Sequence, residues 1–295
     1  MQLKRRAQRE IMLVDLVEIT TADDVSLDGA FFEPQCQLIA ENRIDGFLLI
    51  HGSGGRFYSS ATRTMASDLS KSGYPCLTLN TRGHDTVWID NQAGTFHGNA
   101  FEILDDSKLD LRAGVDFLHN RGIQRICLLG HSMGAVKVSY YTAFENDPRI
   151  QAVIPVSPVR LSYSYYMRSK DSEEFQYNLE LADEMEADGR ALDLMKVNFP
   201  ITQFFSAASY LDKHGPGERY NLVDLAPRIH VPVLALAGSL ETHTRLVNMA
   251  SDLVLAAVNS PSASYEIIDG GDHSLQNRKA AASQSVLEWI PRLKS

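Results

Sequence analysis

The chain has 295 residues, of which 44% are hydrophobic and 22% are charged, proportions typical of a globular protein rather than a fibrous or disordered one. Its 28 basic and 37 acidic side chains leave a net charge of −9, which opposes binding to nucleic acid or to an anionic membrane surface. This length allows one large α/β domain or two ordinary domains.

The chain opens with a basic segment at residues 1–10, but the apolar stretch after it is short and contains Asp15. No signal peptide or membrane span is predicted, and a solvated tail over residues 1–13 is favoured over a transit peptide. Three cysteines lie near apolar stretches without CxxC spacing: Cys36, Cys76 and Cys127. Buried, reduced thiols and a cytoplasmic location are therefore expected.

Short apolar runs alternate with longer amphipathic segments along most of the chain, the pattern of parallel strands joined by helices. An antiparallel strand pair at the sheet edge is expected first, at 14–20 and 25–32. Further strands are predicted at 46–50, 75–80, 125–130, 152–156, 231–237 and 264–268, with helices at 61–71, 109–120, 135–145, 245–258 and 280–293. The prediction is an α/β fold with a mostly parallel sheet of about eight strands, flanked by helices.

One segment, residues 159–228, is far too long for a simple connection between two strands. It contains ten of the 23 Phe and Tyr residues of the chain, and helices are expected in it at 179–195 and 203–213. We predict an inserted, mainly helical cap here, with the core domain formed by residues 14–158 and 229–295. The rings could contact an apolar or aromatic substrate, or could simply pack the cap onto the core.

The sequence Gly130-His131-Ser132-Met133-Gly134 matches the G-x-S-x-G pattern and lies between a predicted strand and a predicted helix. A sharp strand-to-helix turn strains the central residue, so its neighbours must lack bulk, which the two glycines provide. Ser132 is therefore the expected nucleophile, and helix capping is the alternative role.

A serine hydroxyl needs a base to take its proton and a carboxylate to orient that base. His273 follows the last predicted strand, at the sheet edge where catalytic side chains gather. Glu241 follows the preceding strand and is the expected acid. Asp269 and Asp252 remain possible substitutes, whereas Asp272 is adjacent to the histidine and would have to fold back.

A tetrahedral intermediate also needs hydrogen-bond donors for its oxyanion. The segment His51-Gly52-Ser53-Gly54-Gly55 follows a predicted strand, where an oxyanion loop is expected. We expect the backbone N–H groups of Ser53 and Met133 to serve, with Gly54 as second choice to Ser53. A phosphate loop is disfavoured because neither glycine-rich phosphate motif is complete. No cofactor or metal site is predicted, since the sequence has no HExxH motif or paired cysteines.

Together these motifs resemble the α/β-hydrolase superfamily over roughly residues 14–293. The stretch Asn80-Thr81-Arg82-Gly83-His84-Asp85 is similar to the family's D-x-R-G-x-G loop, with Asn80 in place of Asp and Asp85 in place of Gly. A glutamate as the acid is a variant that the family tolerates. The resemblance further implies that residues 159–228 correspond to the lid inserted after strand six.

The expected activity is hydrolysis of a carboxylic ester of a small apolar or aromatic substrate, through an acyl-enzyme intermediate. A thioesterase, lactonase, amidase, carbon–carbon bond hydrolase or acyltransferase could use the same residues. A receptor that keeps the scaffold without turnover is the non-enzymatic alternative. The expected partner is a small-molecule substrate, and the sequence does not distinguish a homodimer from a monomer.

Overall fold

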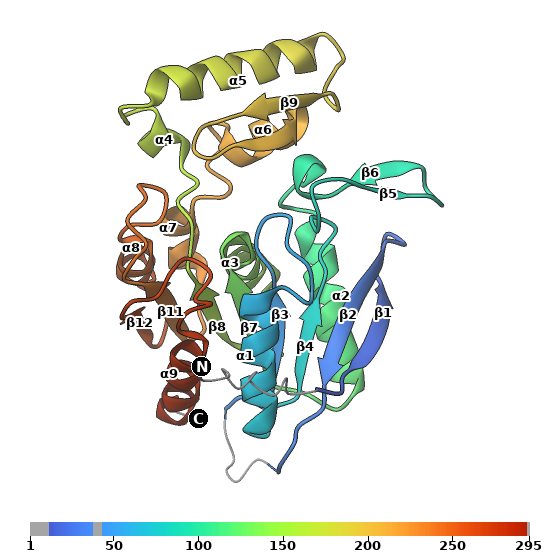
Figure 1. Cartoon of the computed structure of the whole chain (residues 1–295), viewed down its shortest axis with the longest axis vertical. Coiled ribbons are helices and arrows are strands. Elements are labelled where there is room, and N and C mark those ends of the chain that lie inside the picture. The colour runs from blue at the N-terminus through green and yellow to red at the C-terminus, as the bar shows by residue number, and fades with distance from the viewer. Residues whose placement is uncertain (1–11, 38–42, 294–295) are drawn as a thin grey trace, which may run out of the picture.

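The computed structural model describes residues 12–37 and 43–293. Most of the expected N-terminal tail, residues 1–11, lies outside the described residues. Figure 1 shows a large sheet with helices on both faces and a further group of elements beyond one edge of the sheet.

The central sheet has eight strands in the order β1-β2-β4-β3-β7-β8-β11-β12. Their bounds are β1 Asp15–Thr20, β2 Ser26–Phe32, β3 Gly46–Ile50, β4 Cys76–Leu79, β7 Ile126–His131, β8 Ile150–Val156, β11 Val233–Gly238 and β12 Ala263–Ile268. β2 pairs antiparallel with β1 and β4, and the remaining pairs are parallel. The predicted mostly parallel sheet with an antiparallel edge pair is confirmed.

The central strands are buried on both faces, which explains why β3, β4, β7, β8 and β11 are nearly continuous apolar runs, whereas the edge strands β1 and β12 are largely exposed. In β3, Phe47 and Leu49 point into one core while Leu48 and Ile50 point into the other. One face is covered by α1 (Ser60–Lys71) and α9 (Lys279–Trp289), and the opposite face by α2 (Ser107–Asn120), α3 (Met133–Glu145) and α8 (Met249–Ala256). The catalytic candidates all lie beyond the carboxyl ends of these strands.

Two predicted helices near the carboxyl terminus had wrong bounds. The helix expected at 245–258 begins only at Met249, after Asn248 in the left-handed backbone region with φ 63°. The residues before it form the loop that carries Glu241. The helix expected at 280–293 ends at Trp289 and continues as a 3₁₀ turn, Ile290–Arg292, that contains a proline. A proline lacks the N–H that an α-helix requires.

A short antiparallel hairpin, absent from the sequence prediction, follows β4. It comprises β5 (Trp88–Asp90) and β6 (Thr95–His97), and leads into the 3₁₀ turn η1 (Asn99–Phe101). The turn closes through the Gly94 N–H, which donates to the Asp90 carbonyl (2.7 Å). Its strands are too short and too exposed for a periodic apolar pattern.

Residues 159–228, here called the insertion, lie mainly beyond the carboxyl edge of the sheet (Figure 1). Their elements are α4 (Tyr163–Tyr166), α5 (Ser172–Ala187), β9 (Leu194–Val197), β10 (Gln203–Ser206), α6 (Ala207–His214), α7 (Leu222–Leu225) and the 3₁₀ turn η2 (Ala226–Arg228). Both helix predictions were partly wrong. The first helix ends at Ala187, before Gly189 with φ 76°, and the second begins only after β10.

The insertion has a small core of its own. Rings of five residues pack together there: Tyr166, Phe175, Phe199, Phe205 and Tyr210. By contrast, Tyr220 and Leu222 pack in the main core. These two residues therefore pack with the main domain rather than with the separate core of the insertion.

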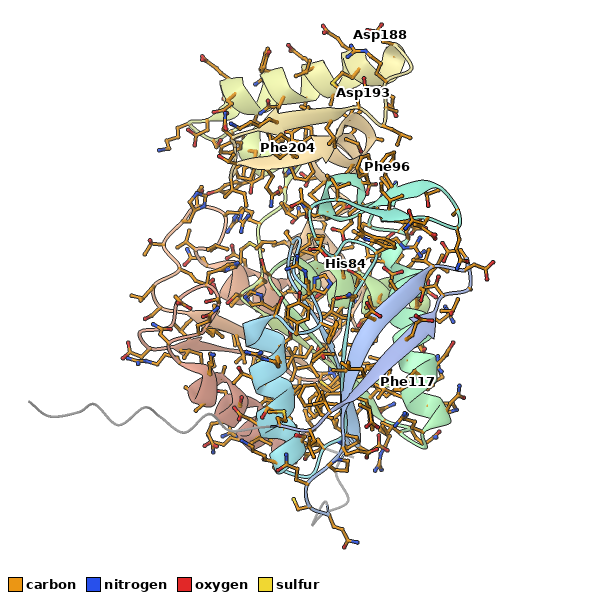
Figure 2. The ribbon with its side chains drawn as sticks, turned by 45° about the vertical axis from the view of Figure 1, so that its right-hand side comes forward. His84, Phe96, Phe117, Asp188, Asp193 and Phe204 are labelled. Carbon is orange, nitrogen blue, oxygen red and sulfur yellow. The ribbon has the colours of Figure 1, made fainter. Side chains whose placement is uncertain are left out.

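Hydrogen bonds join the insertion to the loop after the β5–β6 hairpin. The Ser209 hydroxyl donates to the Glu102 carbonyl (3.0 Å), and the Leu104 N–H donates to the Asp212 carboxylate (2.9 Å). Figure 2 labels Phe204 on β10 of the insertion and Phe96 on β6 of this hairpin. The insertion is thus tied to the core at a point remote from its two connecting segments.

Within residues 12–37 and 43–293, no helix is both long and apolar enough to cross a membrane. All three thiols are free. Cys76 and Cys127 are buried, but Cys36 is exposed, so the expectation that all three are buried was wrong for that residue.

Candidate active site

Ser132 lies at the turn from β7 into α3 with φ 57° and ψ −115°. Such a backbone conformation costs about 1–3 kcal/mol for a residue with a side chain. The flanking glycines are required by close backbone contacts: a Cβ on Gly130 would lie 2.1 Å from the Gly134 carbonyl oxygen, and one on Gly134 would lie 2.4 Å from that of Ile50. The turn is therefore packed too tightly for other residues.

The His273 side chain reaches the serine from the loop after β12. Its Nε2 lies 3.0 Å from the Ser132 Oγ. The backbone of this histidine is held by His131, whose Nε2–H donates to the His273 carbonyl (2.7 Å). Burial lowers the pKa of His131 to about 4, so its ring is neutral near pH 7. His131, the residue directly before the nucleophile, thus positions the base.

The Glu241 carboxylate is buried behind the histidine. Its Oε1 lies 3.7 Å from the His273 Nδ1 and accepts hydrogen bonds from the Ser157 hydroxyl (2.5 Å) and the Gly238 N–H (3.2 Å). Gly238 also brings the acid and base loops together, because a Cβ there would lie 2.2 Å from the Gly271 carbonyl oxygen. Ser157 was not predicted from the sequence, because it follows β8 in no recognisable motif.

The other candidate acids have different surroundings. Asp252 pairs with Arg160 (2.8 Å), and Asp269 is exposed. Asp272 accepts hydrogen bonds from the Ser274 hydroxyl (3.0 Å) and the Gln276 N–H (3.1 Å). The structure therefore brings Glu241 to the histidine, and does not bring these three aspartates there.

The segment expected to supply an oxyanion donor forms a tight turn beside the serine. The Gly55 N–H donates to the Gly52 carbonyl (3.0 Å), and a Cβ on Gly52 would lie 3.0 Å from the Ser132 Cβ. Ser53, between them, lines one pocket with Ser132 and Met133, whereas Gly54 does not. Met133 is the first residue of α3, so its N–H has no acceptor within the helix.

His51 shapes this turn, a role that the sequence analysis did not assign. Its Nε2 accepts from the Thr81 N–H (3.1 Å), so Nδ1 carries the proton and donates to the Gly52 carbonyl (2.7 Å). Burial is the main cause that lowers the pKa of His51 to about 3. A neutral histidine therefore holds the turn at neutral pH. The sequence signal for this role was the position of His51 directly after β3 and before Gly52.

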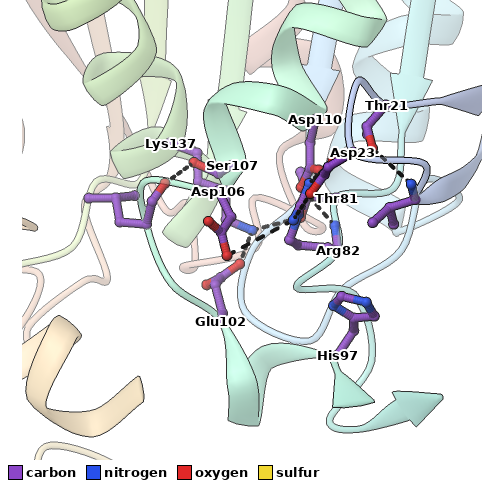
Figure 3. A network of polar contacts seen from close by, with 12 residues as sticks. Thr21, Asp23, Thr81, Arg82, His97, Glu102, Asp106, Ser107, Asp110 and Lys137 are labelled. Atoms are coloured by element: carbon purple, nitrogen blue, oxygen red, sulfur yellow. Dashed lines mark hydrogen bonds and ion pairs between the residues drawn. The ribbon is translucent and has the colours of Figure 1, made fainter. Parts of the chain in front are cut away.

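The loop at residues 80–85 is stabilised by the two residues that depart from the family pattern. The Asn80 side-chain oxygen accepts from the Phe57 N–H (2.7 Å), and Asp85 forms an ion pair with Arg56. Figure 3 shows Arg82 between two further acids. The Arg82 side chain bonds the buried Asp110 (2.9 Å) and also Asp23 (2.8 and 2.9 Å). This loop is a structural support, and its departures do not disrupt it.

A buried charged cluster lies between this loop and the insertion. The Lys137 ammonium, from α3, pairs with one oxygen of Glu102, and the Lys213 ammonium, from α6, lies 3.6 Å from the other. The Lys137 Nζ also donates to the Thr81 hydroxyl (2.7 Å), as Figure 3 shows. A Cβ on Gly83 would overlap the Glu102 carboxylate. This cluster was not predictable from the sequence, because its members are far apart along the chain.

The pocket over Ser132 lies between the core and the insertion. It is lined by Ser53, Ser132, Met133, Val159, Leu161, Pro200, Gln203, Lys213, His214 and Arg245. Its open space is about 10 Å³, roughly the room for one water molecule. An ester therefore reaches the serine only when the lining moves.

None of the ten Phe and Tyr residues of the insertion lines this pocket. Five of them instead form the core of the insertion. Packing, rather than substrate contact, is thus what these rings do in this arrangement. The many rings of the insertion therefore no longer support the expectation of an aromatic substrate. Val159, Leu161 and Pro200 still give the pocket apolar walls.

His214 yields a prediction about acid stability. It lies among aromatic rings, with the Tyr210 ring centroid 4.7 Å away, and burial lowers its pKa to about 3. The unfolded chain, with a histidine pKa near 6.5, binds this proton more tightly than the folded chain does. The free energy of unfolding therefore falls as the pH drops from about 6.5 to 3, by up to about 1.4 kcal/mol per pH unit for one proton.

Replacing His214 with Phe removes this proton, so the pH dependence of the free energy of unfolding between pH 4 and 6 becomes shallower by about one proton. Urea denaturation at several pH values measures it. The exposed His230, changed to Gln, is the control and should keep the wild-type slope. An unchanged slope in the Phe variant would contradict the assignment of a buried neutral ring.

The geometry defines a class of protein. A serine at a strand-to-helix turn, a carboxylate after a later strand and a histidine after the last strand is the order found in α/β hydrolases. A model of the alpha/beta hydrolase fold matches residues 46–205, more than half of the chain. The chain belongs to this family, as its motifs suggested.

Individual relatives are more distant. The thermostable monoacylglycerol lipase of Bacillus sp. (strain H-257) is 31% identical over 118 residues, which are 40% of this chain and 42% of that protein. The match thus spans less than half the length of this curated relative.

Solved structures share the fold at low identity. Est1E from Butyrivibrio proteoclasticus is 17% identical with a TM-score of 0.64, covering 94% of this chain and 98% of that one. The α/β hydrolase GrgF from Penicillium sp. sh18 is 18% identical with a TM-score of 0.69, covering 95% and 99%. The Pyrococcus furiosus esterase Pf2001 is 19% identical with a TM-score of 0.63, covering 96% and 92%.

Proposed function

We propose that this chain is a serine hydrolase that cleaves carboxylic esters through an acyl-enzyme. The observation that carries the proposal is the 3.0 Å separation between the Ser132 Oγ and the His273 Nε2, with the buried Glu241 carboxylate behind the ring. A nucleophile, a base within hydrogen-bond reach and an orienting acid are the parts that acyl transfer requires.

In the proposed reaction, the Ser132 Oγ attacks the acyl carbon while the His273 Nε2 takes the hydroxyl proton. The carbonyl oxygen becomes an oxyanion that accepts hydrogen bonds from the Ser53 and Met133 N–H groups. The intermediate then collapses: the ester bond breaks, and the alkoxide leaves with the proton from His273. Water, deprotonated by the same histidine, releases the acid and restores the serine.

In this proposal Glu241 keeps the His273 ring in one tautomer and stabilises its protonated form. The Ser157 hydroxyl and the Gly238 N–H hold the carboxylate from the other side. The insertion acts as a lid, since it supplies six of the ten residues that line the pocket: Val159, Leu161, Pro200, Gln203, Lys213 and His214. A lid excludes water and selects the substrate.

Family membership and the names of several relatives support ester hydrolysis. The relative that matches over part of its length is called a monoacylglycerol lipase. Among the structural neighbours, one is called esterase Pf2001 and another is called Est1E. The fold alone does not choose among acyl substrates, so the proposal rests on the site rather than on these names.

A substrate panel tests the proposal. Purified protein is assayed against esters of increasing acyl length, then against lactones and thioesters, with release of acid followed at constant pH. We expect turnover of esters, and the acyl length that is hydrolysed fastest measures the room that the pocket offers once its lining has moved. Faster turnover of thioesters or lactones would redirect the assignment, and transfer to an added alcohol would indicate an acyltransferase. Absence of turnover with every member would contradict it.

A further inference from the structure

The charged side chains that line the pocket over Ser132 are both cationic: Lys213 from the insertion and Arg245 from the loop after β11. No aspartate or glutamate of the described residues lines this pocket. The remaining polar lining is uncharged, because burial holds the pKa of His214 at about 3.

Lys213 is only 5% exposed, and its Nζ is buried without a hydrogen-bond partner among the described residues. The closest carboxylate oxygen, on Glu102, lies 3.6 Å away, and the other oxygen of that carboxylate pairs with the Lys137 ammonium. Two buried ammonium groups therefore share one carboxylate. Burial is the largest cause that lowers the pKa of Lys213.

The other nearby acids, Asp212 and Glu241, attract these cations from a distance but form their hydrogen bonds with other groups. Asp212 accepts from the Leu104 N–H (2.9 Å) and the Tyr220 hydroxyl (2.8 Å), and pairs with Arg219 (2.8 Å). Glu241 is engaged by Ser157 and lies beside the histidine. Both carboxylates are therefore committed elsewhere.

Arg245, on the loop after β11, is the second cation that lines the pocket. Unlike Lys213 it is only partly buried, and no ion pair joins it to a carboxylate of the described residues. Burial, the largest influence, lowers its pKa despite the attraction of Tyr166 and Glu241. Burying an uncompensated cation is costly unless something pairs with it.

We propose that the substrate of this site is an ester that carries a carboxylate, bound by Lys213 and Arg245 while Ser132 attacks its ester carbonyl. This inference rests on the proposed function. A planar carboxylate can accept two hydrogen bonds from a guanidinium and a third from an ammonium. The apolar walls, Val159 and Leu161, then contact the hydrocarbon between the carboxylate and the ester.

Two pairs of probes test the inference in the intact protein. Monomethyl adipate and methyl hexanoate differ only by a carboxylate or a methyl at the end of the acyl chain. The 4-acetoxybutanoate anion and butyl acetate differ in the same way on the alcohol side. We expect kcat/KM to favour the anionic member of at least one pair by about tenfold or more, the ratio that about 1.4 kcal/mol represents.

Two variants, Lys213→Met and Arg245→Met, each remove one cation while keeping a long apolar side chain. Each is expected to reduce the anionic-to-neutral ratio of kcat/KM by about tenfold. Lys196→Met, which removes an exposed cation of the insertion, is the matched control and should retain both the ratio and the activity. Thermal unfolding of each variant checks the fold.

The outcomes separate the two claims. If both neutral esters are hydrolysed as fast as their anionic partners by wild-type protein, the carboxylate inference is wrong while ester hydrolysis stands, whether or not the variants fold. A preference that persists in both folded Met variants also overturns it. If no ester of either kind is hydrolysed, the proposed function fails, and the inference fails with it.

Discussion

Replacing Ser132 with alanine is expected to lower kcat for ester hydrolysis by about 10⁴- to 10⁶-fold, the range seen when the nucleophile of a serine hydrolase is removed. The Oγ is the atom that forms the acyl bond, and no neighbouring hydroxyl can take its place at the tip of the turn. Alanine must adopt the same φ of 57°, so the change isolates the hydroxyl from the backbone strain. Steady-state kinetics on the preferred ester measures the effect.

Ser139 provides a matched control for that variant. It lies on the helix that follows Ser132, is fully buried, and its hydroxyl has no hydrogen-bond partner among the described residues. Ser139→Ala therefore removes a hydroxyl from the same helix without touching the reaction, and should retain activity close to wild type. A folded Ser132→Ala protein with more than about a hundredth of wild-type kcat would require a different nucleophile.

Replacing Glu241 with glutamine is expected to lower kcat by about 10³- to 10⁴-fold, because a neutral amide cannot stabilise the His273 imidazolium and favours the wrong tautomer. The His273 Nδ1 and the Glu241 Oε2 are both buried without a hydrogen-bond partner among the described residues. The Glu241 Oε1 lies 3.7 Å from the His273 Nδ1. A small rotation of either side chain therefore brings the carboxylate and the ring nitrogen within hydrogen-bond distance. The effect should fall on kcat rather than on KM.

The same experiment resolves the choice of acid that the sequence left open. Asp252→Asn and Asp269→Asn are the controls, since the first residue pairs with Arg160 and the second is exposed. Both should keep kcat within about threefold of wild type, a change of less than about 1 kcal/mol. A larger loss in either aspartate variant than in Glu241→Gln would assign the acid to that aspartate.

The central strands were predictable because they are buried on both faces and therefore form short apolar runs in the sequence. β3 was predicted with its observed bounds, Gly46–Ile50, because both Leu48 and Leu49 contact a core. The helix bounds in the insertion were not predictable in this way. β9 and β10 there are only four residues long, which is too short for an alternating pattern to distinguish them from the ends of neighbouring helices.

The order of nucleophile, acid and base along the sequence was predictable because each follows a strand whose carboxyl end meets the same sheet edge. The supporting contacts were not. Ser157 reaches Glu241, and Lys213 reaches Glu102, only because residues 84 and 111 positions apart meet in the fold. No local motif marks such pairs, since a buried lysine and an exposed one have the same sequence signal.

The most direct test of the central claim is labelling with a fluorophosphonate, followed by mass-spectrometric mapping of the modified residue. The reagent phosphonylates a serine only where a base activates the hydroxyl, so it reports the combined action of Ser132 and His273 without knowledge of the substrate. The predicted result is stoichiometric modification of Ser132 in folded protein, lost in His273→Ala and in heat-denatured samples. Folded wild-type protein that stays unmodified at Ser132, or is modified at another serine, would contradict the account.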